Sequence, residues 1–327
     1  PDGNDSGTFN SSSKILFIRL NRIGDALVST PLIHYIKEKI NSRIYVLADL
    51  KNYFALENNP DIEKVLIFRK GITGFREFFD FIKSEKIDTI IDLHDDVSAT
   101  VSFLIALSRV RNKFGLEKTN KKLYTKTVPK PDPINIHIIY RILELSRLFN
   151  LEPEDAEICI RYFPKPQAME KADKFISENF TKGSAVLGIN LSAGSDARFW
   201  GIKRYKELIN SLFSYKIEIL ILAAPKDKDK VELIGYPKYF LSESFDEFAA
   251  VISKLKVIFT PDTAAIHLAA ASGVPVFGLY VHDTADKIWS PAGVDFDYVE
   301  TQGHNLNNLD FEKVLLKFIP FLEKHIK

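Results

Sequence analysis

The strongest constraint on the fold is an alternation of short β-rich runs with longer helical patterns, which begins at Lys14 and restarts near residue 169. Parallel strands joined by helical crossovers produce such an alternation. The strands expected in the first half are 15–18, 43–48, 64–68, 88–93 and 111–114. Those expected in the second half are 185–190, 217–222, 256–259 and 274–279. The sequence therefore predicts two doubly wound α/β units.

The domain boundaries follow from where the alternation stops and resumes. At 327 residues the chain exceeds the usual size of a single hydrophobic core. Three prolines interrupt a stretch of little periodicity and indicate a linker. We therefore expect a disordered leader over 1–13, an N-terminal domain over 14–155, a linker over 156–168, a C-terminal domain over 169–308 and a closing helix over 309–327, with a cleft between the domains.

Composition excludes several classes of protein. With 46% hydrophobic residues, the chain has enough apolar material for two cores. A net charge of +1 provides no global field for binding nucleic acid. The single cysteine, Cys159, cannot form an internal disulfide, which favours a cytoplasmic compartment. No apolar run approaches the ~20 residues of a membrane-spanning helix, so we expect a soluble or peripheral protein.

Polar or glycine-containing segments follow several of the predicted strands. Ligands of open parallel sheets bind beyond the carboxyl ends of the strands, so these segments are expected to face the cleft. They are 21–25, 92–96, 192–198, 225–227, 262–267 and 282–283.

The first of these segments contains Gly24, which permits a tight turn, and Asp25, which is expected near the start of a helix. One interpretation of Asp25 is a helix cap, and the other is a general base. A helix N-terminus favours the carboxylate, so Asp25 is expected to be ionised at neutral pH. The segment lacks the G-x-G-x-x-G pattern of dinucleotide-binding folds, which argues against a dehydrogenase.

Two segments of the second half have features of an anion site. Thr263 and His267 lie one helical turn apart at the start of a predicted helix, where free amides and the helix dipole suit a phosphate. The alternative is that Asp262 caps this helix and that His267 is an ordinary core histidine. The loop 192–198 adds small residues and a cation, which also fit an anionic ligand. Its candidate residues are Ser192, Gly194 and Arg198.

Two further segments allow a functional and a structural explanation. The stretch 118–130 has five lysines and no acidic residue, which is typical of a surface loop. If it lines the cleft, Lys121 and Lys122, together with Arg22, would attract an anionic acceptor or phospholipid head groups. The cluster 94–96 has donors for a metal ion, but local adjacency is weak evidence for a site, and a solvated loop is the favoured explanation.

Two motifs of the sequence resemble the family 9 glycosyltransferases, whose best known members are the lipopolysaccharide heptosyltransferases. The first runs from residue 15 to 27 and continues with Thr30-Pro31-Leu32. The second is Thr260-Pro261-Asp262-Thr263, which is followed by residues 267–270 and 273–276. The loop 192–205 is similar more loosely. The resemblance implies a GT-B fold, in which two Rossmann-like domains carry the acceptor and the nucleotide-sugar donor respectively.

The resemblance also implies roles for single residues. Asp25 matches the proposed catalytic base, and Arg198 lies where a basic residue approaches the donor phosphates. The residues that match donor contacts are Asp262, Thr263 and His267. The sequence departs from the family pattern at Ala264, Phe199, Gly201 and 281–282, which leaves the sugar and the nucleotide open.

The function implied is inverting, metal-independent transfer of a sugar, with heptose from ADP-heptose as the leading donor and inner-core lipopolysaccharide as the acceptor. Alternatives are transfer of another nucleotide-activated sugar to a glycan or protein, and a noncatalytic nucleotide- or glycan-binding module. A metal-dependent phosphoryl enzyme would rest on His94, Asp95 and Asp96 alone. No cofactor is expected. A glycolipid acceptor would bring this cytoplasmic protein to the inner face of a bacterial cytoplasmic membrane.

Overall fold

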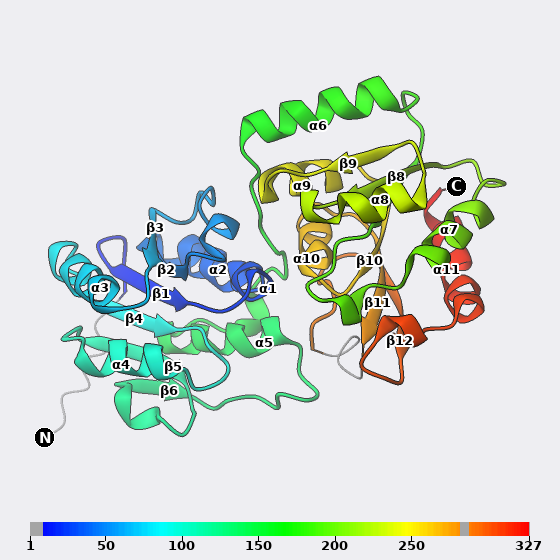
Figure 1. Ribbon diagram of the computed structural model, residues 1–327. Coiled ribbons are helices and arrows are strands. Elements are labelled where there is room, and N and C mark those ends of the chain that lie inside the picture. The colour runs from blue at the N-terminus through cyan, green and yellow to red at the C-terminus, as the bar shows by residue number, and fades with distance from the viewer. Residues whose placement is uncertain (1–8, 282–287, 327) are drawn as a thin grey trace, which may run out of the picture. The chain divides into compact units, whose positions relative to one another are not determined.

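The computed structural model describes residues 9–281 and 288–326, and the chain divides after Arg161 into two compact units (Figure 1). Each unit contains a parallel sheet of six strands with flanking helices. This confirms the predicted class of two doubly wound α/β domains. The division lies inside the segment 156–168 that the sequence predicts as a linker. His282 and Asp283, which were expected to face the cleft, lie outside the described residues.

The sheet of the first unit has the strand order β3-β2-β1-β4-β5-β6. Its strands are β1 (Lys14–Arg19), β2 (Arg43–Asp49), β3 (Lys64–Phe68), β4 (Thr89–Asp92), β5 (Asn112–Leu116) and β6 (Lys126–Val128). Its helices are α1 (Ile23–Leu27), α2 (Thr30–Ile40), α3 (Ile72–Ser84), α4 (Ala99–Leu107) and α5 (Ile138–Leu143). The chain adds strands on one side of β1 and then continues with β4 on the other side. A topological switch point therefore lies between β1 and β4.

The sheet of the second unit repeats this layout, with the order β12-β11-β10-β7-β8-β9. Its strands are β7 (Val186–Asn190), β8 (Glu218–Ala223), β9 (Tyr239–Leu241), β10 (Val257–Pro261), β11 (Val276–Val281) and β12 (Phe296–Thr301). Its helices are α6 (Pro166–Asn179), α7 (Ile202–Ser211), α8 (Lys228–Ile234), α9 (Phe245–Ile252), α10 (Ala264–Ala271) and α11 (Phe311–Ile326). Here the switch point lies between β7 and β10. Ligands of such sheets bind at these points, beyond the carboxyl ends of the strands.

The helix that the sequence predicts near Asp25 is interrupted after one short turn. Helix α1 ends at Leu27 and α2 begins at Thr30, with Pro31 in its first turn. Proline has no N–H, and in a continuous helix its ring would clash with the carbonyl four residues earlier. The hydroxyl of Thr30 donates to the Leu27 carbonyl (2.7 Å), and that of Ser29 donates to the Asp25 carbonyl (2.8 Å). These side chains satisfy carbonyls that the break leaves free.

Other differences from the expected elements concern short segments. The sequence pattern missed β6, β9, β12 and α8. Strand β6 lies inside the lysine-rich stretch 118–130, where its three residues are too few to show a period. Residues of the predicted leader also make defined contacts: the Phe9 ring packs on Phe149 (4.6 Å between ring centroids). The ordered part of the first unit therefore includes residues before Lys14.

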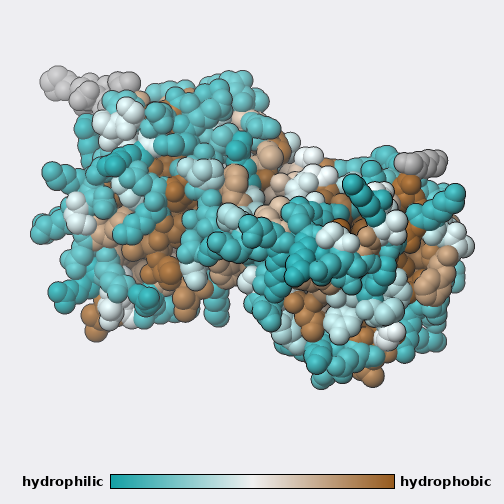
Figure 2. Space-filling model, turned by 90° about the horizontal axis from the view of Figure 1, so that it is seen from above, coloured by the Kyte–Doolittle hydropathy of each residue, from teal (hydrophilic) through white to brown (hydrophobic). Residues whose placement is uncertain are grey.

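The surface in Figure 2 is largely hydrophilic, with smaller apolar patches between the polar side chains. Apolar atoms always form part of a folded protein's surface, so such patches are ordinary. Among the residues that the structure describes, no helix has the length and apolar character needed to cross a bilayer.

Gly74, in the first turns of α3, marks a close backbone approach. A Cβ atom built there would lie 1.6 Å from the carbonyl oxygen of Arg69. Backbone cannot move aside as a side chain can, so we expect Gly74→Ala to lower the free energy of unfolding by about 1–3 kcal/mol. Gly303→Ala is the control, because a Cβ there meets only contacts of 3.7 Å or more. Equal urea midpoints for the two variants would contradict the prediction.

Candidate functional site

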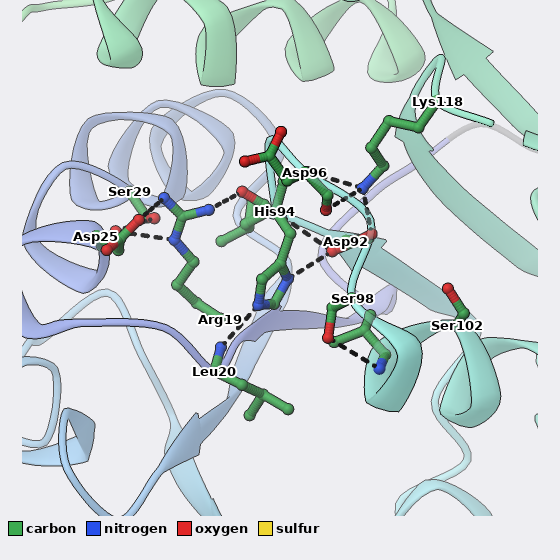
Figure 3. Close-up of polar contacts among 12 residues, drawn as sticks. Arg19, Leu20, Asp25, Ser29, Asp92, His94, Asp96, Ser98, Ser102 and Lys118 are labelled. Carbon is green, nitrogen blue, oxygen red and sulfur yellow. Dashed lines mark hydrogen bonds and ion pairs between the residues drawn. The ribbon is translucent and has the colours of Figure 1, made fainter. Parts of the chain in front are cut away.

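Asp25 lies at the switch point of the first unit, as the third residue of α1 (Figure 3). One carboxylate oxygen, Oδ1, accepts a hydrogen bond from Arg19 Nη2 (2.9 Å), and Oδ2 accepts one from the backbone N–H of Arg22 (3.2 Å). The second bond is a capping contact, so Asp25 does help to start the helix. The carboxylate is therefore held on two sides, and it still reaches solvent, because the side chain is 13% exposed.

Arg19, which sequence reasoning missed, is the direct partner of Asp25. Its side chain is 1% exposed, and it donates to the Asp25 carboxylate, to the Asp25 carbonyl (Nε, 3.1 Å) and to the Leu93 carbonyl. Burial lowers the pKa of the Arg19 guanidinium, while Asp25 opposes this shift. An arginine keeps its charge in proteins, so the pair is ionic. The feature of the sequence that could have indicated this partner was an arginine at the end of an otherwise apolar strand.

Asp92, at the end of β4, is the centre of a buried polar cluster. Its carboxylate accepts bonds from His94 Nδ1 (2.7 Å), Lys118 Nζ (2.6 Å) and the Tyr124 hydroxyl (2.7 Å). Burial alone would raise the pKa of Asp92, but the bonds from His94 and Lys118 outweigh it and hold the pKa below its usual value. The pKa of Tyr124 is raised by burial and by the Asp92 charge. Asp92 is therefore a satisfied buried anion.

The geometry does not support a metal site at residues 94–96. His94 uses one ring nitrogen for Asp92 and accepts the Leu20 N–H with the other (3.2 Å). Asp95 pairs with Arg141 (2.7 Å). Within residues 9–281 and 288–326, no three metal-binding side chains come together. The simple explanation of a solvated loop is also wrong for His94, which is buried.

The proposed acceptor contacts are solvent-facing. Arg22 is exposed immediately before α1, and Lys121 and Lys122 are exposed on a short 3-10 helix, Lys121–Leu123. Lys121 pairs with Glu117 (3.2 Å). Lys118, by contrast, is buried against Asp92, so the stretch 118–130 is not a uniform solvated loop.

In the second unit, Arg198 and Asp262 come together at the start of α10. Arg198 Nη1 donates to the Asp262 carbonyl (2.8 Å), and its Nη2 lies 3.3 Å from Asp262 Oδ2. The N-cap of α10 is Thr263, whose hydroxyl accepts the Ala265 N–H (3.3 Å). The alternative in which Asp262 caps the helix is therefore wrong. A half-exposed cation and hydroxyl stand at the positive end of an eight-residue helix.

His267, further along α10, is 3% exposed, and its ring centroid lies 6.4 Å from that of Trp289. Tyr280, at the end of β11, is another buried aromatic residue near this site. Burial raises its pKa well above the usual value, with the charge of Asp262 as the next cause. In the sequence, Tyr280 cannot be distinguished from the other apolar positions of a buried strand.

Ser192 joins β7 to β8 at the same edge of the second sheet. Its hydroxyl donates to Asp227 (2.7 Å) and accepts the Ala224 N–H (2.7 Å). A cavity of about 300 Å³ is lined by Ser192, Ala224, Pro225 and residues 242–245 and 248. Gly194 is exposed, with open space where a Cβ would point. The predicted donor residues therefore lie on the loops that follow β7 and β10, except His267, which lies inside α10.

Asn190 links these two strands at the switch point, which sequence reasoning also missed. Its Nδ2 donates to the Thr260 hydroxyl (2.9 Å), and its Oδ1 accepts the Ser192 N–H (3.1 Å). One buried amide thus fixes both loops that carry the candidate anion-binding residues. Its position as the last residue of an apolar strand was the available signal.

Comparisons with known proteins agree with this layout. The lipopolysaccharide core heptosyltransferase OpsX of Haemophilus influenzae (strain ATCC 51907 / DSM 11121 / KW20 / Rd) is 21% identical over 282 residues, which is 82% of this chain and 79% of that protein. A family 9 glycosyl transferase from Veillonella parvula DSM 2008 has a similar structure, with a TM-score of 0.83 at 17% identity over 97% of this chain and 99% of that chain.

The E. coli heptosyltransferase WaaC, solved with ADP, matches with a TM-score of 0.73 at 16% identity over 96% of this chain and 99% of that chain. At these identities the structures establish the fold, which is the predicted two-domain GT-B fold. The family model described as glycosyltransferase family 9 (heptosyltransferase) matches residues 75–317. This span is well over half of the sequence and includes the second motif, and the chain therefore belongs to glycosyltransferase family 9.

Proposed function

We propose that this glycosyltransferase moves heptose from ADP-heptose to an inner-core lipopolysaccharide acceptor, with inversion and without a metal ion. Membership of the family and the heptosyltransferase activity of its relatives support the sugar and the acceptor. The observation that carries the proposal is the Asp25 carboxylate, which is accessible and lies at the switch point of a sheet. An accessible carboxylate fixed by two donors suits a general base.

The reaction needs a base and a site for a departing diphosphate. We assign Asp25 to accept the proton of the acceptor hydroxyl as the oxygen attacks the anomeric carbon from the face opposite the nucleotide. The bond from the anomeric carbon to the phosphate oxygen breaks, and the nucleoside diphosphate leaves with that electron pair. The sugar passes through an oxocarbenium-like state, as in glycoside hydrolysis.

The second unit supplies groups suited to the diphosphate. The start of α10 provides backbone amides and the positive end of a helix dipole, and Arg198 adds a full charge. Thr263 and His267 are assigned as further donor contacts on the same helix, and Ser192 and Gly194 as contacts from the loop after β7. The cavity beside Ser192 has aromatic lining at Phe245 and Phe248, which suits a flat nucleobase. Fixed charges and dipoles of the protein would then stabilise the leaving diphosphate, a role that a bound metal ion has in other enzymes.

The acceptor side of the proposal uses the exposed cations of the first unit. Arg22, Lys121 and Lys122 are assigned to the anionic groups of a glycolipid acceptor. Such an acceptor would place the enzyme transiently on the inner face of a bacterial cytoplasmic membrane. Binding through these cations should weaken as the salt concentration rises, because exposed charges are screened.

The test of the function is a panel of nucleotide sugars, read by mass spectrometry of product formed on purified inner-core acceptors. ADP-heptose should give a product with the mass of one added heptose, and chelator should leave the rate unchanged. Transfer from another donor, or to a protein, would replace this substrate assignment. Binding of donor without transfer or slow hydrolysis would favour a noncatalytic module, and a chelator-sensitive rate would contradict metal independence.

Arg198 provides a separate test of the donor site. We expect Arg198→Ala to weaken ADP binding by about 10- to 150-fold, because a charge-assisted contact to phosphate contributes about 1.5–3 kcal/mol. Calorimetric titration with ADP measures the change. Lys203→Ala is the matched control: it removes a cation five residues away whose side chain is 88% exposed. Equal ADP affinity for both variants would remove Arg198 from the donor site.

A further inference from the structure

The backbone between β1 and α1 is held from both neighbouring strands by buried side chains. On the β2 side, Asn52 Nδ2 donates to the carbonyls of Arg19 (3.1 Å) and Asn21 (3.0 Å). Asn52 is fully buried, and its own Oδ1 accepts the Asp49 N–H (2.8 Å). The amide group is therefore fixed to the end of β2 before it contacts the turn.

On the β4 side, His94 makes the corresponding contact. Its Nε2 accepts the N–H of Leu20 (3.2 Å), and its Nδ1 lies 2.7 Å from Asp92 (Figure 3). A backbone N–H can only donate, so Nε2 carries no proton and Nδ1 donates to Asp92. His94 is thus a neutral imidazole whose orientation Asp92 fixes. Together, Asn52 and His94 hold the polar backbone groups of three consecutive residues.

We propose that His94 and Asn52 are positioning residues for Asp25. The proposal rests on the role of Asp25 as the base in the proposed function. Arg19 carries the effect, because its backbone belongs to the clamped turn while its guanidinium binds the Asp25 carboxylate and carbonyl and the Leu93 carbonyl. A shift of Leu20 would move Arg19 and, with it, the carboxylate.

The position of Asp25 matters because a general base works only within hydrogen-bond reach of the proton that it removes. A misplacement of about 1 Å can lower a rate ~100-fold. Helix α1 has only five residues, so it cannot fix Asp25 by its own stability. The hydrogen bonds from Asn52 and His94 hold the turn in place, because they join it to the ends of β2 and β4, two strands in the interior of the sheet.

A pair of substitutions at His94 separates positioning from simple stabilisation. In His94→Gln, the side-chain amide places an acceptor near the position of Nε2, whereas His94→Asn keeps a donor near Nδ1 and loses the acceptor for Leu20. We expect His94→Asn to lower kcat about 10- to 100-fold with an unchanged KM for the donor. The Gln variant should keep kcat within a few-fold of the wild type.

His34 is the matched control in the same unit, because it is also bonded at both ring nitrogens, to Asp61 (2.9 Å) and to Arg161 (2.7 Å). Its Gln and Asn variants should show no such difference in kcat. A second measurement uses the Asp25→Asn background, where the base is already absent. There, His94→Asn should cause no further loss, because positioning acts only through Asp25.

Three results would overturn the proposal: equal kcat in the Gln and Asn variants of His94, a loss explained by the unfolded fraction, or an undiminished effect in the Asp25→Asn background. If His94→Asn does not fold, Asn52→Ala is measured in the same two backgrounds with the same expectations. Undiminished turnover in Asp25→Asn alone would instead refute the proposed base. The two failures are therefore distinguishable.

Discussion

Asp25→Asn is expected to lower kcat for sugar transfer by about 100- to 10,000-fold, which is the usual contribution of a general base. The amide keeps the size of the carboxylate and can still accept a bond from Arg19 or from the Arg22 N–H. It cannot take up a proton from the acceptor hydroxyl. A loss of this size corresponds to about 3–5 kcal/mol in the barrier. Product formation under saturating donor and acceptor measures it.

The controls separate chemistry from folding and from donor binding. ADP affinity should stay near that of the wild type, because the proposed diphosphate contacts belong to the other unit. Circular dichroism should show an intact fold, since Arg19 retains its bond to the Leu93 carbonyl. Full turnover in Asp25→Asn would reject the assignment of the base, whereas a parallel loss of ADP binding would point to a wider structural defect.

The alternation of the sequence was sufficient to predict both parallel sheets, apart from the edge strands β6, β9 and β12, and the segments that carry the candidate sites. Segments 21–25, 92–96, 192–198 and 262–267 do follow β1, β4, β7 and β10, the strands that flank the two switch points. Strands buried on both faces have continuous apolar runs, and these are the runs that sequence patterns detect well. The contact between Arg198 and Asp262 could also have been predicted, since both residues were candidates for one anion site.

The partners inside the first unit were not predictable in the same way. Lys118 and Asp92 are 26 residues apart, and Leu20 and His94 are 74 apart, so no local spacing indicates either contact. Charge counting groups Lys118 with the other four lysines of the stretch 118–130, because a cation in a polar stretch normally faces water. Only the packing of β5 and the following turn against β4 shows that this lysine is the counterion of a buried carboxylate.

Lys118→Met is expected to lower the free energy of unfolding of the first unit by about 3–5 kcal/mol at neutral pH, because it leaves a buried carboxylate without its cation. The Lys118 side chain is 3% exposed and that of Asp92 is 1% exposed, so water cannot replace the lost partner. Hydrogen exchange of peptides from β1, β4 and β5 measures the effect. Lys121→Met, which removes an exposed lysine from the same segment, should change stability by less than ~1 kcal/mol.

The stabilisation that the Lys118–Asp92 pair contributes should depend on pH. The pKa of Asp92 is lowered in the folded protein, so its contribution to stability is complete above the unfolded value of about 4 and is lost as the pH falls below it. The difference in the free energy of unfolding between the wild type and Lys118→Met should therefore become smaller at acidic pH. The two tryptophans, Trp200 and Trp289, both lie in the second unit, so their fluorescence reports separately on the unit without the substitution. A difference that stays constant from pH 7 to pH 3 would show that Lys118 stabilises the fold by packing and not through the charge of Asp92.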